Sequence, residues 1–115
     1  MGPLKNPNRR GSIWMYDVSG TGPPQRVPLE GLPPMLDFKP LGIDIWDNGP
    51  GEAFSLFVVN HRRGNSVVDF FHLERKPLKM TYRRSFAMPA MCSPNNVAAT
   101  GPKSFYMTQG VCSRL

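Results

Sequence analysis

The chain has 115 residues and a formal net charge of +6, and this length is enough for one ordinary domain. Its 13 prolines and 11 glycines interrupt the chain too often for long helices, coiled coils or helical bundles. Hydrophobic residues make up 40%, too many for a disordered chain, and the longest largely apolar run, Phe54 to Val59, is far shorter than the roughly 20 residues of a transmembrane helix. We therefore expect an all-β, turn-rich domain without a transmembrane segment.

Short segments rich in β-branched and aromatic residues predict strands along the chain. The predicted strands are Ser12–Val18, Gly42–Trp46, Ala53–His61, Ser66–Glu74, Leu78–Phe86, Asn95–Thr100 and Lys103–Thr108, with a short extended piece near Arg26–Leu29. Turn-forming residues separate them, as in Asp47–Gly51 and Arg62–Asn65. Gly42–Trp46 alternates apolar and polar residues, which is typical of a half-buried strand. The charges of Leu78–Phe86 place that strand nearer a sheet edge.

The order of these strands predicts a repeating β architecture. Residues 42–86 form four antiparallel strands joined by short turns, and a meander of this size is typical of one β-propeller blade. Residues 95–108 echo residues 42–60, with a strand, a Gly-Pro turn and an aromatic-bearing strand. A simple meander sandwich accounts for the strands equally well, and the echo favours the propeller. On this interpretation residues 12–18 are a strand of the preceding blade, 42–86 are one blade and 95–108 begin the next.

The charged residues carry no familiar enzymatic pattern. Basic residues occur in pairs such as Arg62-Arg63 at the ends of apolar segments, which predicts solvated turn and edge positions and argues against a nucleic-acid partner. Asp44 is expected to face solvent, whereas Asp37 and Asp69 stand alone. No paired carboxylates at hydrolase spacing are present.

Two positions carry side chains suited to a site at the end of a strand. His61 ends the strong strand Ala53–His61, where a lone histidine is ordinarily a solvated or hydrogen-bonded turn residue. Asn95 and Asn96 follow a proline and offer amide oxygens suited to a hard cation such as calcium, although such a pair is more often plain turn chemistry. From the residues alone, a catalytic role for His61 and a metal-binding role for the asparagines are each less favoured than an ordinary turn role.

Several segments taken together resemble the serum paraoxonase/arylesterase family. They are Gly11–Asp17, Phe38–Ile43, Leu56–His61, Ser66–Phe71, Ser93–Asn96 and Thr100–Tyr106, in the family's order and rough spacing across nearly the whole chain. The Val-Val-Asn-His and Gly-Pro-x-x-Phe-Tyr hairpins are the more specific elements. The resemblance implies a six-bladed β-propeller with two calcium ions in its tunnel, whose members hydrolyse lactones, aryl esters and some organophosphates. Calcium is implied to polarise the substrate while a histidine dyad activates water.

Position by position, the resemblance implies a partial site. His61 matches the second histidine of the dyad, whereas Leu41 stands in place of the first and cannot accept a proton. Asn95 matches a ligand of the catalytic calcium, Asn96 replaces an aspartate on the structural calcium, and Ile43 matches a backbone-carbonyl contact to that ion. An amide in place of a carboxylate weakens calcium binding. The family's remaining calcium ligands are expected outside residues 1–115.

The sequence therefore predicts part of a calcium-dependent hydrolase of small esters or lactones, inactive as the isolated chain. The expected fold is a fragment of a propeller, about one complete four-stranded blade plus parts of its neighbours. The alternative is a non-catalytic β-sheet interaction module or truncated remnant, and the exposed sheet faces of such a piece predict self-association. Nucleic-acid binding ranks last.

Compartment and redox state are left open by the sequence. The N-terminus lacks the apolar segment of a secretory signal, so none is expected, and no compartment follows. Cys92 and Cys112 are too few for a disulfide scaffold and lack zinc-site spacing. Whether the two thiols are joined or free is not decided by their positions.

Overall fold

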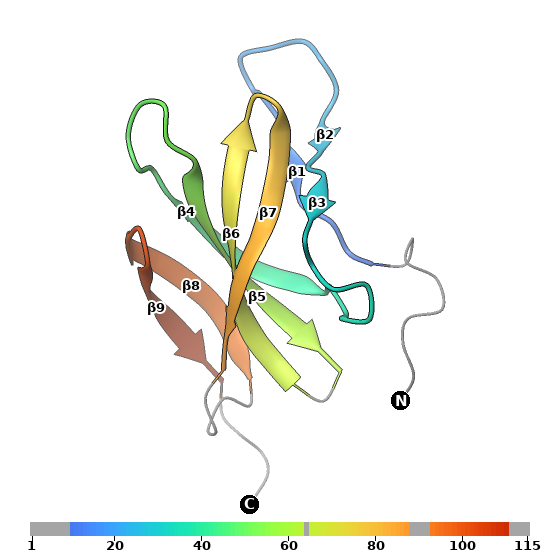
Figure 1. Ribbon diagram of the computed structural model, residues 1–115, viewed down its shortest axis with the longest axis vertical. Helices are drawn as coiled ribbons and strands as arrows, with labels where there is room; N and C mark the ends of the chain where they lie inside the picture. The colour runs from blue at the N-terminus through green and yellow to red at the C-terminus, as the bar shows by residue number, and fades with distance from the viewer. Residues whose placement is uncertain (1–9, 64, 88–92, 111–115) are drawn as a thin grey trace, which may run out of the picture.

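The computed structural model describes residues 10–63, 65–87 and 93–110 (Figure 1). The strands are β1 (Trp14–Met15), β2 (Gln25–Arg26), β3 (Leu29–Glu30), β4 (Pro40–Trp46), β5 (Phe54–Arg62), β6 (Asn65–Arg75), β7 (Leu78–Phe86), β8 (Pro94–Gly101) and β9 (Ser104–Gln109). The described residues contain no helix, which confirms the all-β class. They therefore contain no helix that is long and apolar enough to span a membrane. Cys92 and Cys112 lie outside the described residues.

Four strands form the meander that the sequence predicts. The largest sheet has the order β3-β7-β6-β5-β4, in which β4 to β7 each pair antiparallel with their neighbours in sequence. The meander covers residues 40–86, close to the predicted 42–86. β8 and β9 form a separate antiparallel hairpin over residues 94–109, close to the predicted 95–108. Both strand predictions are confirmed.

The N-terminal segment adds pairings that the sequence pattern does not predict. β1 pairs antiparallel with β2 in a two-stranded sheet, so the strand expected over residues 12–18 is only two residues long. β3 pairs parallel with β7, with Leu29 opposite Met80. The extended piece expected near Arg26–Leu29 is thus two short strands in two sheets. Prolines interrupt this region, and a residue without an N–H cannot continue a ladder of backbone hydrogen bonds.

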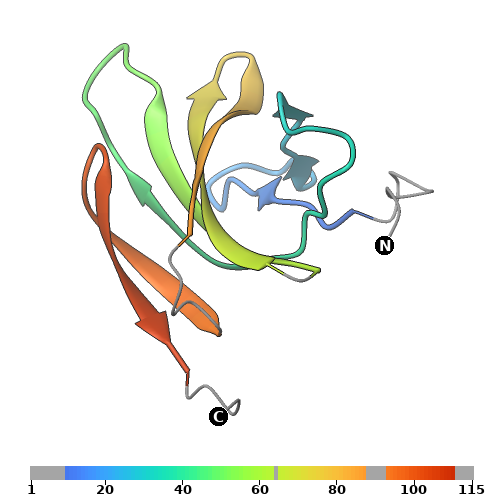
Figure 2. The same cartoon turned by 60° about the horizontal axis from the view of Figure 1, so that its bottom comes forward.

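β5 is buried on both faces because its side chains are apolar on both. Leu56 and Val58 pack in one cluster with side chains of the N-terminal segment, residues 13–38. Phe57 and Val59 point to the other face and pack in a second cluster with β8 and β9. Figure 2 shows the sheet lying between these two covers. Since each such side chain contributes about 1.5–3 kcal/mol when buried, both covers stabilise the sheet.

The apolar side chains of β4 are exposed, although the alternation of a half-buried strand predicts that they are the buried ones. Ile43 and Ile45 lie opposite Val58 and Leu56 and share their face of the sheet, yet each isoleucine is 41% exposed. The N-terminal segment covers the middle of that face and leaves β4 open at the sheet edge. The predicted alternation is therefore present, but its apolar side chains are the exposed ones.

The expectation that the Arg62-Arg63 pair is solvated is wrong for Arg62. Arg62, expected in a solvated turn, lies with Nη2 2.8 Å from Oδ1 of Asp69, which is fully buried. Arg63 binds Asp37, with Nε 3.2 Å from Oδ2. Asp37 and Asp69, which are unpaired with other carboxylates in the sequence, are thus each paired with an arginine. A buried carboxylate requires a counter-charge and hydrogen-bond donors, and the β5–β6 hairpin supplies both here.

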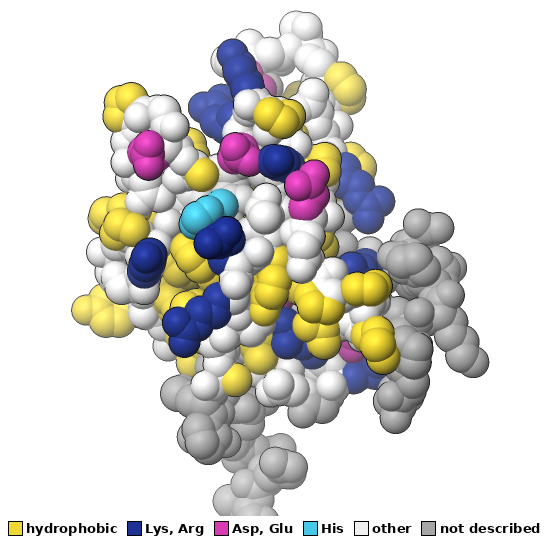
Figure 3. Space-filling view, in the orientation of Figure 1, with side chains coloured by type: hydrophobic (Ala, Val, Ile, Leu, Met, Phe, Trp, Pro, Cys, Tyr) yellow, Lys and Arg dark blue, Asp and Glu magenta, His cyan; other side chains and the backbone are white. Residues whose placement is uncertain are grey.

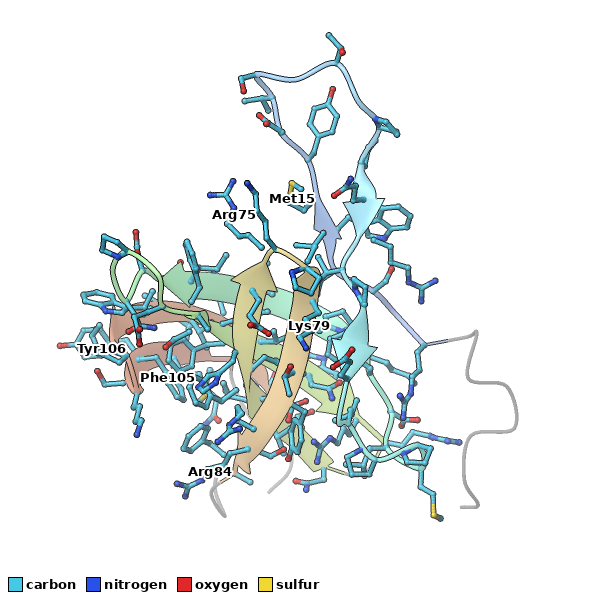
Figure 4. All side chains as sticks on the ribbon, turned by 45° about the horizontal axis from the view of Figure 1, so that its top comes forward. Met15, Arg75, Lys79, Arg84, Phe105 and Tyr106 are labelled. Atoms are coloured by element: carbon cyan, nitrogen blue, oxygen red, sulfur yellow. The ribbon has the colours of Figure 1, made fainter. Side chains whose placement is uncertain are left out.

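The surface mixes charge and apolar groups. On the face seen in Figure 3, Lys and Arg side chains are interspersed with acidic and apolar ones. Lys79 of β7 lies 3.6 Å from Glu30 and 3.7 Å from Glu74, which ties β3 and β6 to it at the surface. Figure 4 shows Tyr106 pointing away from the sheet, in keeping with its 76% exposure. Its neighbour Phe105 joins the second cluster.

Asp37 is expected to couple folding to pH. The backbone N–H and the guanidinium of Arg63 hydrogen-bond its carboxylate and hold the pKa of Asp37 below the ordinary value. The fold thus favours the charged form. The resulting stabilisation is complete above the unfolded pKa of about 3.9 and is lost as the pH falls through the lowered folded pKa.

We expect Asp37→Asn to lower the free energy of unfolding at pH 7 by about 1 kcal/mol, a modest value because the Arg63 guanidinium is partly exposed and screened. The deficit should shrink as the pH is lowered below about 3. Urea unfolding at both pH values measures it, with Glu52→Gln in an exposed turn as the control. A deficit of equal size at both pH values would show that the charge of Asp37 is not the source of the stabilisation.

Candidate functional site

Segments far apart in sequence meet where β4, β5 and β8 come together, here called the β4–β5–β8 junction. His61, near the end of β5, donates from Nε2 to the carbonyl oxygen of Pro94 at 2.7 Å. Asn95 and Asn96 follow Pro94 in β8, and β8 packs beside β4, which carries Ile43. The four residues singled out from the sequence are therefore brought to one junction.

Strand alternation explains why His61 reaches β8. Successive side chains of a strand point to opposite faces, so His61 shares a face with Phe57 and Val59, the face that β8 and β9 cover. Asn60 and Arg62 point to the other face. The histidine thus continues the row of side chains that contacts the hairpin, and its polar ring lies at the end of that row.

Gly42 is the point of closest approach between β4 and β8. A Cβ at Gly42 would fall on Oδ1 of Asn96 and would lie 2.7 Å from both the backbone oxygen of Asn95 and the Cα of Asn96. Real Cβ atoms essentially never make contacts this short, so only glycine allows β8 to lie so near. The absence of a side chain at Gly42 therefore places its neighbour Ile43 close to the asparagine pair.

Two further hydrogen bonds hold the β8–β9 hairpin against the sheet. Asp44 of β4 accepts the backbone N–H of Ala99 at Oδ2, with a distance of 2.7 Å. Ser55 of β5 donates to the carbonyl oxygen of Pro102 at 2.7 Å. The expectation that Asp44 faces solvent is therefore wrong, because it lies opposite Phe57 and shares the face that the hairpin covers.

The two asparagines of β8 are both exposed. Oδ1 of Asn96 accepts the backbone N–H of Val97 at 2.9 Å, and the backbone N–H of Asn96 donates to Oγ1 of Thr108 at 3.0 Å. An amide oxygen has two acceptor positions, so Oδ1 of Asn96 can still accept one more contact. Asn95 is adjacent to the carbonyl that His61 binds. The two side chains thus lie at the surface, while hydrogen bonds from His61 to Pro94 and from Asn96 to Thr108 hold their backbone.

The ring of His61 has one defined orientation. Because a carbonyl oxygen only accepts, Nε2 must carry the proton in the bond to Pro94. In the neutral ring the lone pair is then on Nδ1. The backbone N–H of His61 also donates to the carbonyl oxygen of Lys39 at 3.1 Å, so both the ring and the main chain are held.

No second imidazole accompanies His61 at the β4–β5–β8 junction. Leu41 lies in the irregular part of β4, between the pairings of Pro40 and Ile43, and is 53% exposed. His72 is on β6 opposite Ser55, at the other end of β5. Burial lowers the pKa of His72, and the charges of nearby basic side chains lower it further. Within the described residues, the junction therefore has a single imidazole.

The residues at the junction do not by themselves fit calcium. Ile43, Asn95 and Asn96 offer at most three neutral oxygens, whereas calcium takes six to eight oxygens that usually include carboxylates. Asp44 of β4 carries a carboxylate nearby, but its two oxygens already accept the backbone N–H groups of Ala99 and Ile45. Among the described residues no group of three acidic, histidine or cysteine side chains is placed to hold a metal.

Sequence reasoning missed three residues that shape the junction. Pro94 supplies the carbonyl that His61 binds, and Gly42 allows the close approach of β8. Asn60 is fully buried at the end of an apolar run. Only Asn60 carries a signal in the sequence, because an amide inside an apolar strand must find hydrogen-bond partners when it is buried.

Comparisons with known proteins agree with the resemblance noted from the motifs. The model of the arylesterase family matches residues 4–112. Serum paraoxonase/lactonase 3 of Homo sapiens is 28% identical over 104 residues, which are 90% of this chain and 29% of that protein. Serum paraoxonase/arylesterase 1 of Mus musculus is 29% identical over 106 residues, 90% of this chain and 29% of that protein. The chain thus spans less than a third of the length of the curated relatives it matches.

Gly42→Ala is expected to separate β4 from β8. The added methyl group must displace the Asn95–Asn96 backbone, and such overpacking costs about 1–3 kcal/mol. Gly22→Ala is the matched control, because a Cβ there meets nothing within 4 Å. Urea unfolding measures the loss, and amide chemical shifts locate it in β8. Equal stability of the two variants would show that β8 does not lie against Gly42.

Proposed function

Because the chain belongs to the arylesterase family, we propose that it forms part of a calcium-dependent hydrolase of small esters or lactones. The relatives are named paraoxonase, lactonase and arylesterase, and those names describe proteins of which this chain spans 29%. For this chain, both the activity and the substrate class are proposals. The family match, which extends over residues 4–112, is their first support.

One observation carries the proposal to particular residues. The hydrogen bond of 2.7 Å from His61 to the carbonyl oxygen of Pro94 places the imidazole beside the backbone that leads into Asn95. Gly42 brings Ile43 to the same backbone from the other side. Positions matched to a family site from separate parts of the sequence therefore lie together, as residues of one site would.

In this proposal His61 activates water through Nδ1. Nε2 is occupied by its bond to Pro94, which orients the ring and leaves the lone pair on the other nitrogen. With Leu41 in place of a second histidine, His61 acts without an imidazole partner from this chain. Calcium is the cofactor implied by the family, and Asn95, Asn96 and Ile43 would be only part of its ligand set.

We further propose that the meander of residues 40–86 is one blade of a six-bladed propeller. β1 and β2 would belong to the preceding blade and β8 and β9 to the next. This arrangement is supported by the two covers, which lie on opposite faces of the same sheet as neighbouring blades do (Figure 2). It also accounts for the exposed row on β4, which would be covered by strands that this chain does not supply.

The proposed activity is tested with phenyl acetate. The 115-residue chain is expected to hydrolyse it no faster than buffer, with or without calcium, because three neutral oxygens cannot hold the ion. In a longer protein that contains this segment, Asn95→Ala should abolish hydrolysis. His61→Gln should reduce it less, since a glutamine amide can still donate to the Pro94 carbonyl and keep Asn95 in place.

Asn65→Ala, in the exposed β5–β6 hairpin, is the control and should leave the rate unchanged. Calcium-dependent turnover of phenyl acetate by the 115-residue chain would show that the site is elsewhere. An Asn95→Ala enzyme with an unchanged rate would show the same.

A second candidate function, a β-sheet interaction module, is favoured by the open edge of β4. Leu41, Ile43 and Ile45 are 53%, 41% and 41% exposed, and β4 is the edge strand of the largest sheet. The strand contains no Lys or Arg, the residues that ordinarily discourage pairing between edges. An edge of this kind favours pairing with the same strand of a second copy.

Self-association is therefore expected at high concentration, and Ile45→Lys should weaken it at least about tenfold by placing a charge on the edge strand. Val18→Lys is the control, because Val18 is 89% exposed and lies outside every strand. Sedimentation velocity across a concentration series measures both variants. A wild-type chain that stays monomeric throughout would eliminate this candidate.

A further inference from the structure

Asn60 is the residue of the Val-Val-Asn-His motif to which the proposed function gives no role. It is fully buried, and both ends of its amide are bonded. Oδ1 accepts the backbone N–H of Lys39 at 2.7 Å. Nδ2 donates to the carbonyl oxygen of Asp37 at 2.9 Å and to Oδ2 of Asp69 at 2.8 Å. Asn60 thus bridges β6 to the backbone that leads into β4.

Asp69 fixes which way the Asn60 amide points. An ionised carboxylate only accepts hydrogen bonds, so the NH2 group of Asn60 must face it and the oxygen must face Lys39. Asp69 is fully buried, and its other oxygen accepts from Nη2 of Arg62 at 2.8 Å and from Oγ of Ser85 at 2.6 Å. The carboxylate is therefore held from β5 and β7, and it orients Asn60 from a rigid position.

The peptide groups of Lys39 connect this pair to the β4–β5–β8 junction. Asn60 binds the N–H of Lys39, while the backbone N–H of His61 donates to the carbonyl oxygen of Lys39 at 3.1 Å. The next residue, Pro40, begins β4 opposite Asn60. Two residues further on, Gly42 meets β8. The contacts thus form a closed circuit from β5 to β4, on to β8, and back to His61 through Pro94.

We propose that Asn60, oriented by Asp69, is a positioning residue that sets the start of β4 relative to His61. Through β4 it sets where Ile43 lies with respect to Asn95. The inference rests on the proposed function only for the identity of the residues that are positioned. Its readout is the His61 ring of the 115-residue chain, so it fails or succeeds independently of any esterase activity.

The chain contains only two histidines, so the imidazole signals in an NMR spectrum are readily assigned. In the wild-type chain, 15N spectra should show His61 with its proton on Nε2. In Asn60→Ala, the His61 ring signals should shift and exchange of the Nε2 proton should quicken at least about tenfold. The signals of His72, at the other end of β5, should stay in place.

Two further variants separate positioning from a general loss of stability. Ser85→Ala removes a partner of Asp69 without touching Asn60, so it should lower the unfolding midpoint and leave the His61 signals unchanged. Asn60→Asp combined with Asp69→Asn keeps the bond between the two side chains with its direction reversed and keeps the acceptor for Lys39. Because an aspartate at position 60 cannot donate to the Asp37 carbonyl, this double variant should return the His61 signals only part of the way toward their wild-type positions.

Unchanged His61 signals in folded Asn60→Ala would overturn the inference. Equal shifts in Ser85→Ala would also overturn it, because they would indicate only general destabilisation. Should Asn60→Ala not fold, amide hydrogen exchange of the wild-type chain decides. The Lys39 amide should exchange at least about 100-fold more slowly than that of Gly22 in the exposed turn, and equal rates would refute the bridge.

Discussion

The two-sided burial of β5 is the constraint on which the rest of the structure depends. A strand with large apolar side chains on both faces cannot lie at a surface, so its sheet needs a cover on each side. The N-terminal segment covers one face and the β8–β9 hairpin covers the other. One cover precedes the meander in the chain and the other follows it.

The same constraint sets the positions of the polar residues at the end of β5. Strand alternation directs Asn60 and Arg62 to one face and His61 to the other. On one face a buried carboxylate, Asp69, receives both polar side chains. On the opposite face the imidazole binds the backbone of β8. Asn60 thus ties β5 to the backbone that leads into β4, Arg62 ties it to β6 and β7, and His61 ties it to β8. The same alternation that buries the apolar side chains places the histidine.

At the β4–β5–β8 junction, the three residues predicted as calcium ligands offer no charged oxygen. Gly42 and the Pro94 carbonyl hold β4, β5 and β8 together through steric fit and a hydrogen bond, neither of which needs a metal ion. The oxygens that Ile43, Asn95 and Asn96 offer are neutral. The geometry of the junction is therefore a property of the fold, whereas tight binding of a cation would need negative charge from elsewhere.

The sequence by itself determined the strands of the meander and of the β8–β9 hairpin, because short apolar segments between turn residues are local signals. It also singled out His61 and the asparagine pair as candidate site residues, through motifs that are contiguous in the chain. Only the tertiary structure decided that Arg62 and Asp69 form a buried pair, that Asp44 faces the hairpin, and that the isoleucines of β4 are exposed. Alternation along a strand separates two faces, but which face is covered depends on distant segments that no local pattern specifies.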